Sequence, residues 1–143
     1  MDQESEELLL TQLATQASHR AEEPSDQTVW VIDDDIAVLA LLKSVFGREG
    51  FAILTSASVA EASEAMPRGA TSALVVLDFN IPGGSGLDIL RKLRQQSDAP
   101  VMMVSNVKRA ELVARAFELG ANDFVEKPFD PRSLLVRARR LME

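Results

Sequence analysis

Acidic, hydroxyl and ammonium side chains lie at or just after the ends of the short apolar runs of this sequence. Asp78 follows residues 74–77, an unbroken apolar run typical of a strand that is covered on both faces. The polar residues that follow three other apolar runs are Asp33 with Asp34, Ser105 and Lys127. Three carboxylates held together repel one another and need a cation, and oxygen ligands favour a hard ion such as Mg²⁺. A hydroxyl and an ammonium beside that ion suit the oxygens of a phosphoryl group.

These residue types favour one kind of chemistry over several others. The chain has no GxxxxGK[ST] loop, which disfavours a nucleotide site. It has no cysteine and a single histidine, His19, which excludes disulfides and disfavours a zinc or iron site. The remaining chemistry is the transfer of a phosphoryl group to a carboxylate. Taken alone, however, Asp78 is equally compatible with a strand-end residue that only starts a turn.

The elements that must position these side chains alternate along the chain. We expect strands at residues 29–32, 51–55, 74–78, 100–105 and 123–125, and helices at 36–48, 59–69, 86–94, 108–119 and from 131 to the end. This alternation predicts an α/β fold, a doubly wound five-stranded parallel sheet with five helices and right-handed crossovers. The carboxyl ends of such strands share one edge of the sheet, so the polar side chains can converge there.

Local patterns add detail to these expectations. On the helix at residues 36–48, the spacing places Ile36, Leu39, Ala40 and Phe46 on the core face. Asp35 and Asp130 are expected to cap the helices that follow them. Residues 81–84 contain Pro and two Gly and are expected to form a loop.

Charge is unevenly distributed along the 143 residues, whose net charge is −7. Residues 1–28 hold seven acids and one base, a net charge of −6, and the rest of the chain is close to neutral at −1. That balance gives no broad basic surface for nucleic acid. The N-terminus lacks the basic start of a signal peptide, and no apolar run approaches the roughly 18 residues of a membrane span. We therefore expect a cytoplasmic protein that contacts neither membrane nor nucleic acid.

The first 27 residues differ from the remainder. Leu8, Leu9, Leu10 and Leu13 recur at roughly helical spacing, and residues 24–26 read as a linker. We expect residues 1–27 to be an acidic leader, partly helical or disordered, and residues 28–143 to form one domain. The leucines either belong to a frayed tail or dock on this domain or a partner, and the sequence leaves both open.

Four segments in order make residues 28–142 resemble the receiver domain of two-component response regulators. These segments are residues 31–34, 77–82 with Gly86, 104–105 and 127–129. The resemblance implies a flavodoxin-like sheet with strand order 2-1-3-4-5 and Mg²⁺ as the cofactor. It also implies that a histidine kinase, or a histidine phosphotransfer protein, donates a phosphoryl group to Asp78.

The resemblance assigns a role to each site residue. Asp33 and Asp34 would hold Mg²⁺ together with Asp78 and the backbone carbonyl of Asn80. Ser105 resembles the switch hydroxyl, Lys127 the lysine that binds a phosphoryl oxygen, and Phe124 the rotating aromatic residue. Asn106 departs from the small residue usual in the family and is expected to narrow access to Asp78. Asn80 and Val107 flank the expected path of the hydrolytic water and are expected to tune dephosphorylation.

The function implied by the resemblance is phosphorelay signalling by a protein that catalyses only its own phosphorylation and dephosphorylation. We expect no effector domain after Glu143. Output would then pass through a face made by the fourth helix, the fifth strand and the fifth helix, or the protein would be a shuttle in a relay. An alternative is the receiver fragment of a DNA-binding transcription regulator, for which Asp123 and Arg137 match one charge pair used in homodimers. A remote alternative is an aspartate-nucleophile phosphatase, whose Asp-x-Asp spacing Asp33 and Asp35 share.

Overall fold

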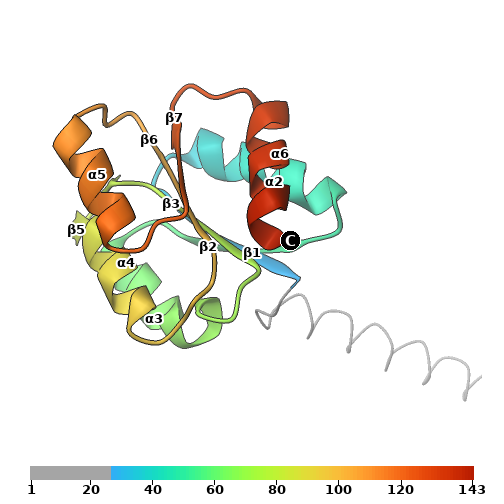
Figure 1. Ribbon diagram of the computed structural model, residues 1–143. Coiled ribbons are helices and arrows are strands. Elements are labelled where there is room, and N and C mark those ends of the chain that lie inside the picture. Colours follow the sequence, from blue (N-terminus) through green and yellow to red (C-terminus); the bar gives the residue numbers. More distant parts are fainter. Residues whose placement is uncertain (1–26) are drawn as a thin grey trace, which may run out of the picture.

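Five parallel strands form the central sheet of the computed structural model, which describes residues 27–143 (Figure 1). The strands are β1 (Thr28–Ile32), β2 (Ala52–Ser56), β3 (Leu74–Leu77), β6 (Val101–Ser105) and β7 (Asp123–Glu126). Their order across the sheet is β2-β1-β3-β6-β7, which confirms the expected order 2-1-3-4-5. All four strand pairs are parallel, so the carboxyl ends lie along one edge.

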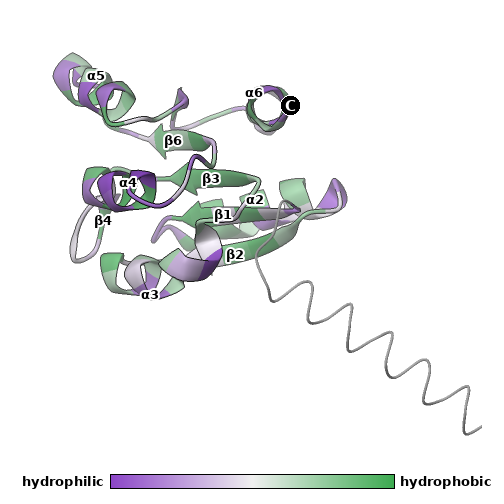
Figure 2. Cartoon of the chain, turned by 60° about the horizontal axis from the view of Figure 1, so that its bottom comes forward, coloured by the Kyte–Doolittle hydropathy of each residue, from purple (hydrophilic) through white to green (hydrophobic). Residues whose placement is uncertain are grey.

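Helices cover both faces of this sheet. Helices α2 (Ile36–Arg48) and α6 (Pro131–Met142) lie side by side on one face. Helices α3 (Val59–Gly69), α4 (Gly86–Arg94) and α5 (Ala110–Glu118) cover the other face (Figures 1 and 2). The described chain therefore has three layers, as expected for a doubly wound fold.

Alternation of side chains along the strands builds two separate cores. In β1, Val29 and Val31 belong to the cluster under α2 and α6, whereas Trp30 and Ile32 belong to the cluster under α3, α4 and α5. Successive strand residues point to opposite faces, so a strand covered on both sides must be apolar throughout. This explains why residues 29–32, 74–77 and 101–104 read as unbroken apolar runs, and Figure 2 shows β3 and β6 in green.

Side-chain caps fix where the helices begin. Asp35 accepts hydrogen bonds from the backbone N–H groups of Ala37 and Val38, and Asp130 accepts one from Arg132. Both caps confirm the sequence expectation and satisfy N–H groups that have no partner within the helix. The cap at Asp35 also determines how the chain leaves β1, because only two residues separate Ile32 from it.

Three expectations about local structure were wrong. Residues 80–85 form a short antiparallel hairpin of β4 (Asn80–Ile81) and β5 (Gly84–Ser85), rather than an irregular loop. On α2, Leu42 and Phe46 are the buried residues, whereas Ile36 is 80% exposed and Ala40 is also exposed. Ile36 lies in the first turn, beside the exposed Asp34 and Asp35. Helix α5 begins at Ala110, two residues later than expected.

The leader expected at residues 1–27 lies outside the described residues, except for Gln27. Within residues 27–143, none of the helices combines the length and the apolar character that crossing a membrane requires.

Candidate functional site

Three polar residues continue the backbone ladder one step beyond the ends of the strands. The N–H of Asp33 donates to the carbonyl of Ser56, and the N–H of Asp78 donates to the carbonyl of Ile32, both at 3.0 Å. The N–H of Lys127 donates to the carbonyl of Ser105, also at 3.0 Å. Each residue is therefore held by sheet geometry at the carboxyl edge, where parallel sheets of this type place their sites.

Lys127 joins the two buried carboxylates of this edge. Its Nζ lies 2.8 Å from Oδ2 of Asp33 and 3.1 Å from Oδ2 of Asp78. Asp33 is 2% exposed and Asp78 is 7% exposed. A buried carboxylate is costly without a partner, so the ammonium compensates two charges that the fold removes from water.

Burial and pairing shift the pKa values of this cluster. Burial raises the pKa of Asp33 above its ordinary value, although hydrogen bonds from Lys127 and from the N–H of Asp35 act in the opposite direction. The nearby charge of Asp78 raises the pKa of Asp33 further. For Lys127, burial acts to lower the pKa, but the hydrogen bonds and charges of Asp33 and Asp78 outweigh it and raise the pKa. The site therefore favours the charged ammonium of Lys127 and disfavours the ionised carboxylate of Asp33.

The donor set fits a hard divalent cation. One carboxylate oxygen from each of Asp33, Asp34 and Asp78 lies within 4.8 Å of the other two, and Asp34 is exposed to solvent. Both oxygens of Asp33 already accept hydrogen bonds, one from Lys127 and one from the N–H of Asp35 at 2.9 Å. Asp34 and Asp78 are thus better placed to ligate an ion directly, with Asp33 acting beside them. An all-oxygen set of this kind suits Mg²⁺.

A cavity of about 380 Å³ opens over this cluster. The residues that line it carry carboxylate, amide, hydroxyl or ammonium groups, and they are Asp34, Asp35, Asp78, Asn80, Ser105, Asn106 and Lys127. Nearly all of the side chains that the sequence placed at the site therefore converge. Asp33 lies beneath the cavity, in contact with Lys127.

Two predicted residues are not among those that line the cavity. Val107 is half-buried and packs against the core under α3, α4 and α5. Phe124 packs against the same core, with its ring centroid 5.8 Å from that of Phe79. Their roles in dephosphorylation and in switching stay predictions.

Ser105 lines the cavity and also contacts Val107, which packs against this core. Its side chain is 1% exposed, and its Oγ accepts a hydrogen bond of 3.2 Å from the N–H of Val107. A hydroxyl can accept and donate at once, so its O–H remains able to donate toward the cavity. A group bound above Asp78 could therefore pull on the residues around Val107 through this side chain.

Gly86 has a packing role that the sequence reading did not recognise. A Cβ atom at this position would overlap the backbone carbonyl of Asp78, and the N–H of Gly86 donates to the carbonyl of Phe79 at 2.7 Å. The start of α4 thus presses against the loop that carries Asp78. The signal in the sequence was a glycine at the first position of a helix, where it lowers helix propensity without a local reason.

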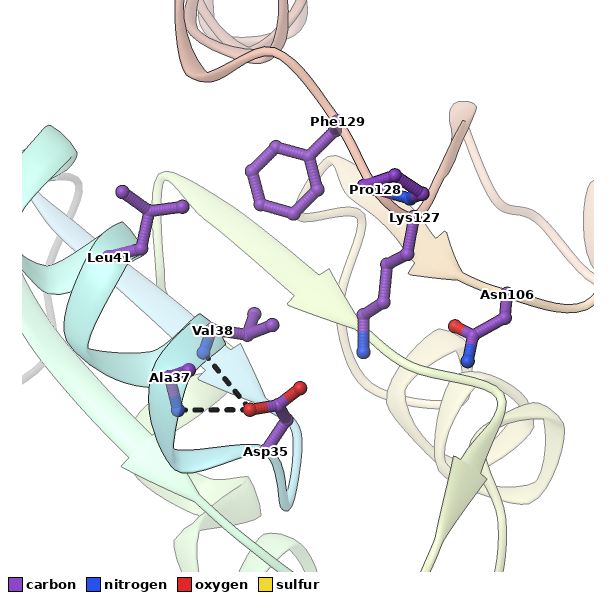
Figure 3. Close-up of a pocket in the computed structure, with 8 residues that line it drawn as sticks. All are labelled: Asp35, Ala37, Val38, Leu41, Asn106, Lys127, Pro128 and Phe129. Carbon is purple, nitrogen blue, oxygen red and sulfur yellow. Dashed lines mark hydrogen bonds between the residues drawn. The ribbon is translucent and has the colours of Figure 1, made fainter.

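The sequence reading also missed a second cavity beside the first. Its lining combines the start of α2 with the loops after β6 and β7, and it consists of Asp35, Ala37, Val38, Leu41, Asn106, Lys127, Pro128 and Phe129 (Figure 3). The Lys127–Pro128 peptide bond in this loop is cis. The signal for this cavity in the sequence was the spacing of apolar residues at positions 37, 38 and 41, which makes a second apolar stripe on α2.

Comparison with known proteins finds relatives for most of the chain. A family model described as the response regulator receiver domain matches residues 29–139. The aerobic respiration control protein ArcA of Escherichia coli strain K12 is 32% identical over 114 residues, which are 80% of this chain and 48% of ArcA. The transcriptional regulatory protein AruR of Pseudomonas aeruginosa is 34% identical over 120 residues, with the same coverage of 80% and 48%.

A solved structure shows the same architecture. The BeF3-activated N-terminal receiver domain of RstA from Klebsiella pneumoniae has a TM-score of 0.75 and 26% identity to this chain. The match covers 81% of this chain and 98% of that domain. The chain thus spans about half the length of the curated relatives that it matches, and nearly all of a receiver domain solved alone.

Proposed function

The chain belongs to the family of response regulator receiver domains, and we propose that it accepts a phosphoryl group on Asp78 in a Mg²⁺-dependent reaction. The observation that carries this proposal is the pairing of Asp78 with Lys127 at 3.1 Å on the floor of an acidic cavity. The donor would be the phosphorylated histidine of a kinase or of a phosphotransfer protein. A cytoplasmic location is part of the same proposal.

The proposed step is a displacement at phosphorus. A carboxylate oxygen of Asp78 forms a bond to phosphorus while the bond from phosphorus to the donor's imidazole nitrogen breaks, and that nitrogen keeps the electron pair. When bound, Mg²⁺ would supply positive charge to the carboxylates and to the phosphoryl oxygens. Lys127 would exchange its hydrogen bond with Asp78 for one with a phosphoryl oxygen, and Ser105 would donate its O–H to another.

The proposed consequence is a changed surface around α5, β7 and α6. Ser105 ends β6, and its neighbour Val107 packs against the same core as Phe124 of β7. Movement of Ser105 toward the phosphoryl group would disturb this packing and shift the population of surface states. Phe117 of α5 and Val136 of α6 are exposed apolar residues that a downstream protein could bind.

Phosphorylation by a small donor tests the proposal directly. The protein is incubated with acetyl phosphate and Mg²⁺, and intact mass spectrometry measures the phosphorylated fraction. We expect uptake by the parent protein, no uptake by Asp78→Asn, and normal uptake by the control Asp88→Asn, which changes an exposed acid of α4. Uptake by Asp78→Asn at the parent rate would refute the assignment.

A second candidate function is that of a receiver in a DNA-binding regulator. It is favoured by the relatives, because AruR is named as a transcriptional regulatory protein and the match covers only 48% of it. Arg137 and Asp123, which match one charge pair used in homodimers of such regulators, pair within one chain here at 2.9 and 3.0 Å. Sequencing the gene past the codon for Glu143 distinguishes the two candidates.

The phosphatase alternative receives less support. It would use Asp35 as a catalytic partner two residues from the nucleophile. Instead, Oδ1 of Asp35 accepts hydrogen bonds from Ala37 and Val38 at the start of α2, which supports a capping role.

A further inference from the structure

The tip of the β4–β5 hairpin is exposed and rich in glycine. Pro82, Gly83 and Gly84 are all exposed, and Gly83 has a φ of +93°, in the left-handed region that favours glycine. Glycine leaves the backbone many accessible conformations, so such a tip is mobile unless a contact from outside the hairpin holds it. The hairpin also carries Asn80, which lines the cavity over Asp78. A contact that holds the tip therefore bears on the site.

The first residue of α3 supplies such a contact. The N–H of Val59 donates a hydrogen bond of 2.9 Å to the carbonyl of Pro82. A Cβ atom added at Gly84 would lie 3.2 Å from Cγ2 of Val59, and one added at Gly83 would lie 3.4 Å from Cβ of Val59. Val59 thus meets the tip of the hairpin with both its backbone and its side chain.

The capping of α3 leaves this N–H free for the hairpin. Oγ of Ser58 accepts a hydrogen bond of 3.1 Å from the N–H of Glu61, and the carboxylate of Glu61 accepts one from the N–H of Ala57. These two bonds fix the start of the helix on either side of Val59. An N–H group in the first turn has no acceptor within its own helix, and that of Val59 finds one in the hairpin.

Two other contacts hold the hairpin away from its tip. Ile81 is 5% exposed and belongs to the core under α3, α4 and α5. The N–H of Gly86, the first residue of α4, donates to the carbonyl of Phe79 at 2.7 Å. In sequence Asn80 lies between Phe79 and Pro82, so the hydrogen bonds from α4 and α3 hold the backbone on both sides of it.

We propose that Val59 is a positioning residue for the Asp78 site, because it holds the hairpin that carries Asn80. This role rests on the proposed function, in which Mg²⁺ binds beside Asp78 and the carbonyl of Asn80 is an expected ligand. Without the hydrogen bond from Val59 the tip moves, Asn80 samples more positions, and the ion binds more weakly. Val59 does not line the cavity, so its effect on the reaction passes through the hairpin.

Val59→Pro tests this role, because it removes the N–H and keeps an apolar ring at the same place. Proline is favoured at the first position of a helix, and Ser58 is already extended, as the residue before a proline must be. Circular dichroism verifies the fold. We expect the ¹⁵N order parameters of Gly83 and Gly84 to fall from about 0.85 to below about 0.6. The Mg²⁺ concentration for half-saturation, measured by calorimetry, should rise several-fold.

Ala110→Pro is the matched control for this substitution. Ala110 is the exposed first residue of α5 and follows the extended Arg109, so proline enters the same helix position there. This control should leave both measurements at the parent values. Val59→Ala keeps the N–H but loses the contact of Cγ2 with Gly84, and should shift both measurements less, in the same direction. Parent values in both Val59 variants would overturn the proposal.

The Mg²⁺ dependence of phosphorylation separates positioning from a general loss of structure. With acetyl phosphate, Val59→Pro should need several-fold more Mg²⁺ for its half-maximal rate and reach the parent rate at saturating Mg²⁺. A rate that stays low at saturating Mg²⁺ would overturn the role of Val59. If the parent protein took up no phosphoryl group, the proposed function would fail, and the order parameters with the Mg²⁺ titration would still decide the role of Val59.

Discussion

Lys127 and Asp78 lie 49 residues apart in sequence, yet Nζ of Lys127 donates a hydrogen bond of 3.1 Å to Oδ2 of Asp78. The same Nζ contacts Asp33 at 2.8 Å, so one ammonium compensates two buried carboxylates. Without a bound cation, these ion pairs offset the repulsion between the two carboxylates at this edge of the sheet.

Removal of Lys127 should destabilise the metal-free protein. Lys127→Ala leaves Asp33 and Asp78 buried without their counter-charge, which we expect to cost about 2–4 kcal/mol of unfolding free energy. Added Mg²⁺ should restore more stability to this variant than to the parent, since it supplies the missing positive charge. Urea unfolding with and without Mg²⁺ measures both effects. Lys108→Ala, which changes an exposed lysine, is the control, and equal stability of the two variants would contradict the prediction.

The buried carboxylate of Asp33 should make stability depend on pH. Because burial raises the pKa of Asp33 in the folded protein, the folded state holds the proton more tightly than the unfolded state does. Its stabilising contribution is complete below the unfolded pKa and is lost as pH rises through the folded pKa. At neutral pH the ionised Asp33 therefore lowers stability.

Asp33→Asn should remove this cost. We expect metal-free Asp33→Asn to gain about 1 kcal/mol at pH 7, a typical size for a single substitution, and to lose the gain as pH falls below the unfolded pKa of Asp33. The same variant should bind Mg²⁺ more weakly. Thermal unfolding across pH, with Glu64→Gln as the exposed control, measures the gain. A variant less stable than the parent at pH 7 would contradict this reasoning.

Lys127 should make stability depend on pH in the alkaline range. Its pKa is raised in the folded protein because the hydrogen bonds and charges of Asp33 and Asp78 outweigh its burial. The stability that it contributes is therefore present below its unfolded pKa and is lost as pH rises through the folded pKa. Alkaline unfolding should occur at lower pH in Lys127→Met than in the parent, as circular dichroism would show. If the two proteins unfolded at the same alkaline pH, the result would contradict a stabilising role for the ion pairs of Lys127.

Close packing at Gly86 should make this position intolerant of any side chain. In Gly86→Ala the new Cβ would overlap the carbonyl oxygen of Asp78, so α4 or the site loop must move. We expect a loss of about 1–3 kcal/mol, the usual cost of overpacking, together with slower phosphorylation.

Gly47→Ala is the matched control for this substitution. Gly47 lies within α2, and a Cβ there has no atom within 4 Å. Because alanine has the higher helix propensity, this variant should be up to about 1 kcal/mol more stable. Chemical denaturation of both variants checks the pair, and similar losses in both would show that steric overlap at Asp78 is not the cause.

The strand order and the convergence of the site could be predicted because parallel strands have a simple signature. Residues 74–77 and 101–104 are apolar throughout, since each strand is covered by helices on both faces. Once the strands are known, the polar residues at and just beyond their carboxyl ends must lie near the shared edge. Asp33, Asp78 and Lys127 were found by this argument, and the backbone ladder confirms it.

The buried face of α2 could not be predicted in the same way. Residues 36–42 are seven consecutive apolar residues, so the periodicity fits more than one face of a helix. The cap at Asp35 and packing against β1 and β2 select the face of Leu42 and Phe46. Ile36 is left on the surface, and Ala37, Val38 and Leu41 form a second apolar stripe beside the site. Likewise, only side-chain geometry shows that Lys127 pairs with Asp33 as well as Asp78.

Access of water to Asp78 should set the lifetime of the phosphorylated state. Hydrolysis needs a water molecule in line behind the phosphorus. Asn80 and Asn106 line the cavity above Asp78, whereas Val107 is half-buried against the core and its apolar side chain cannot orient a water molecule. The parent protein should therefore dephosphorylate slowly.

Val107→Glu and Val107→Gln should speed this hydrolysis. A polar side chain at position 107 is disfavoured in the core and should turn toward the cavity mouth, where it can orient the water. A gain of about 1.4 kcal/mol would give a tenfold faster rate, so we expect a several-fold increase while phosphorylation of Asp78 persists. The measurement is decay of the phosphorylated protein with the donor removed and Mg²⁺ held constant, with Lys108→Gln as the neighbouring exposed control. Equal or slower decay in both Val107 variants would show that this side chain does not limit access of water.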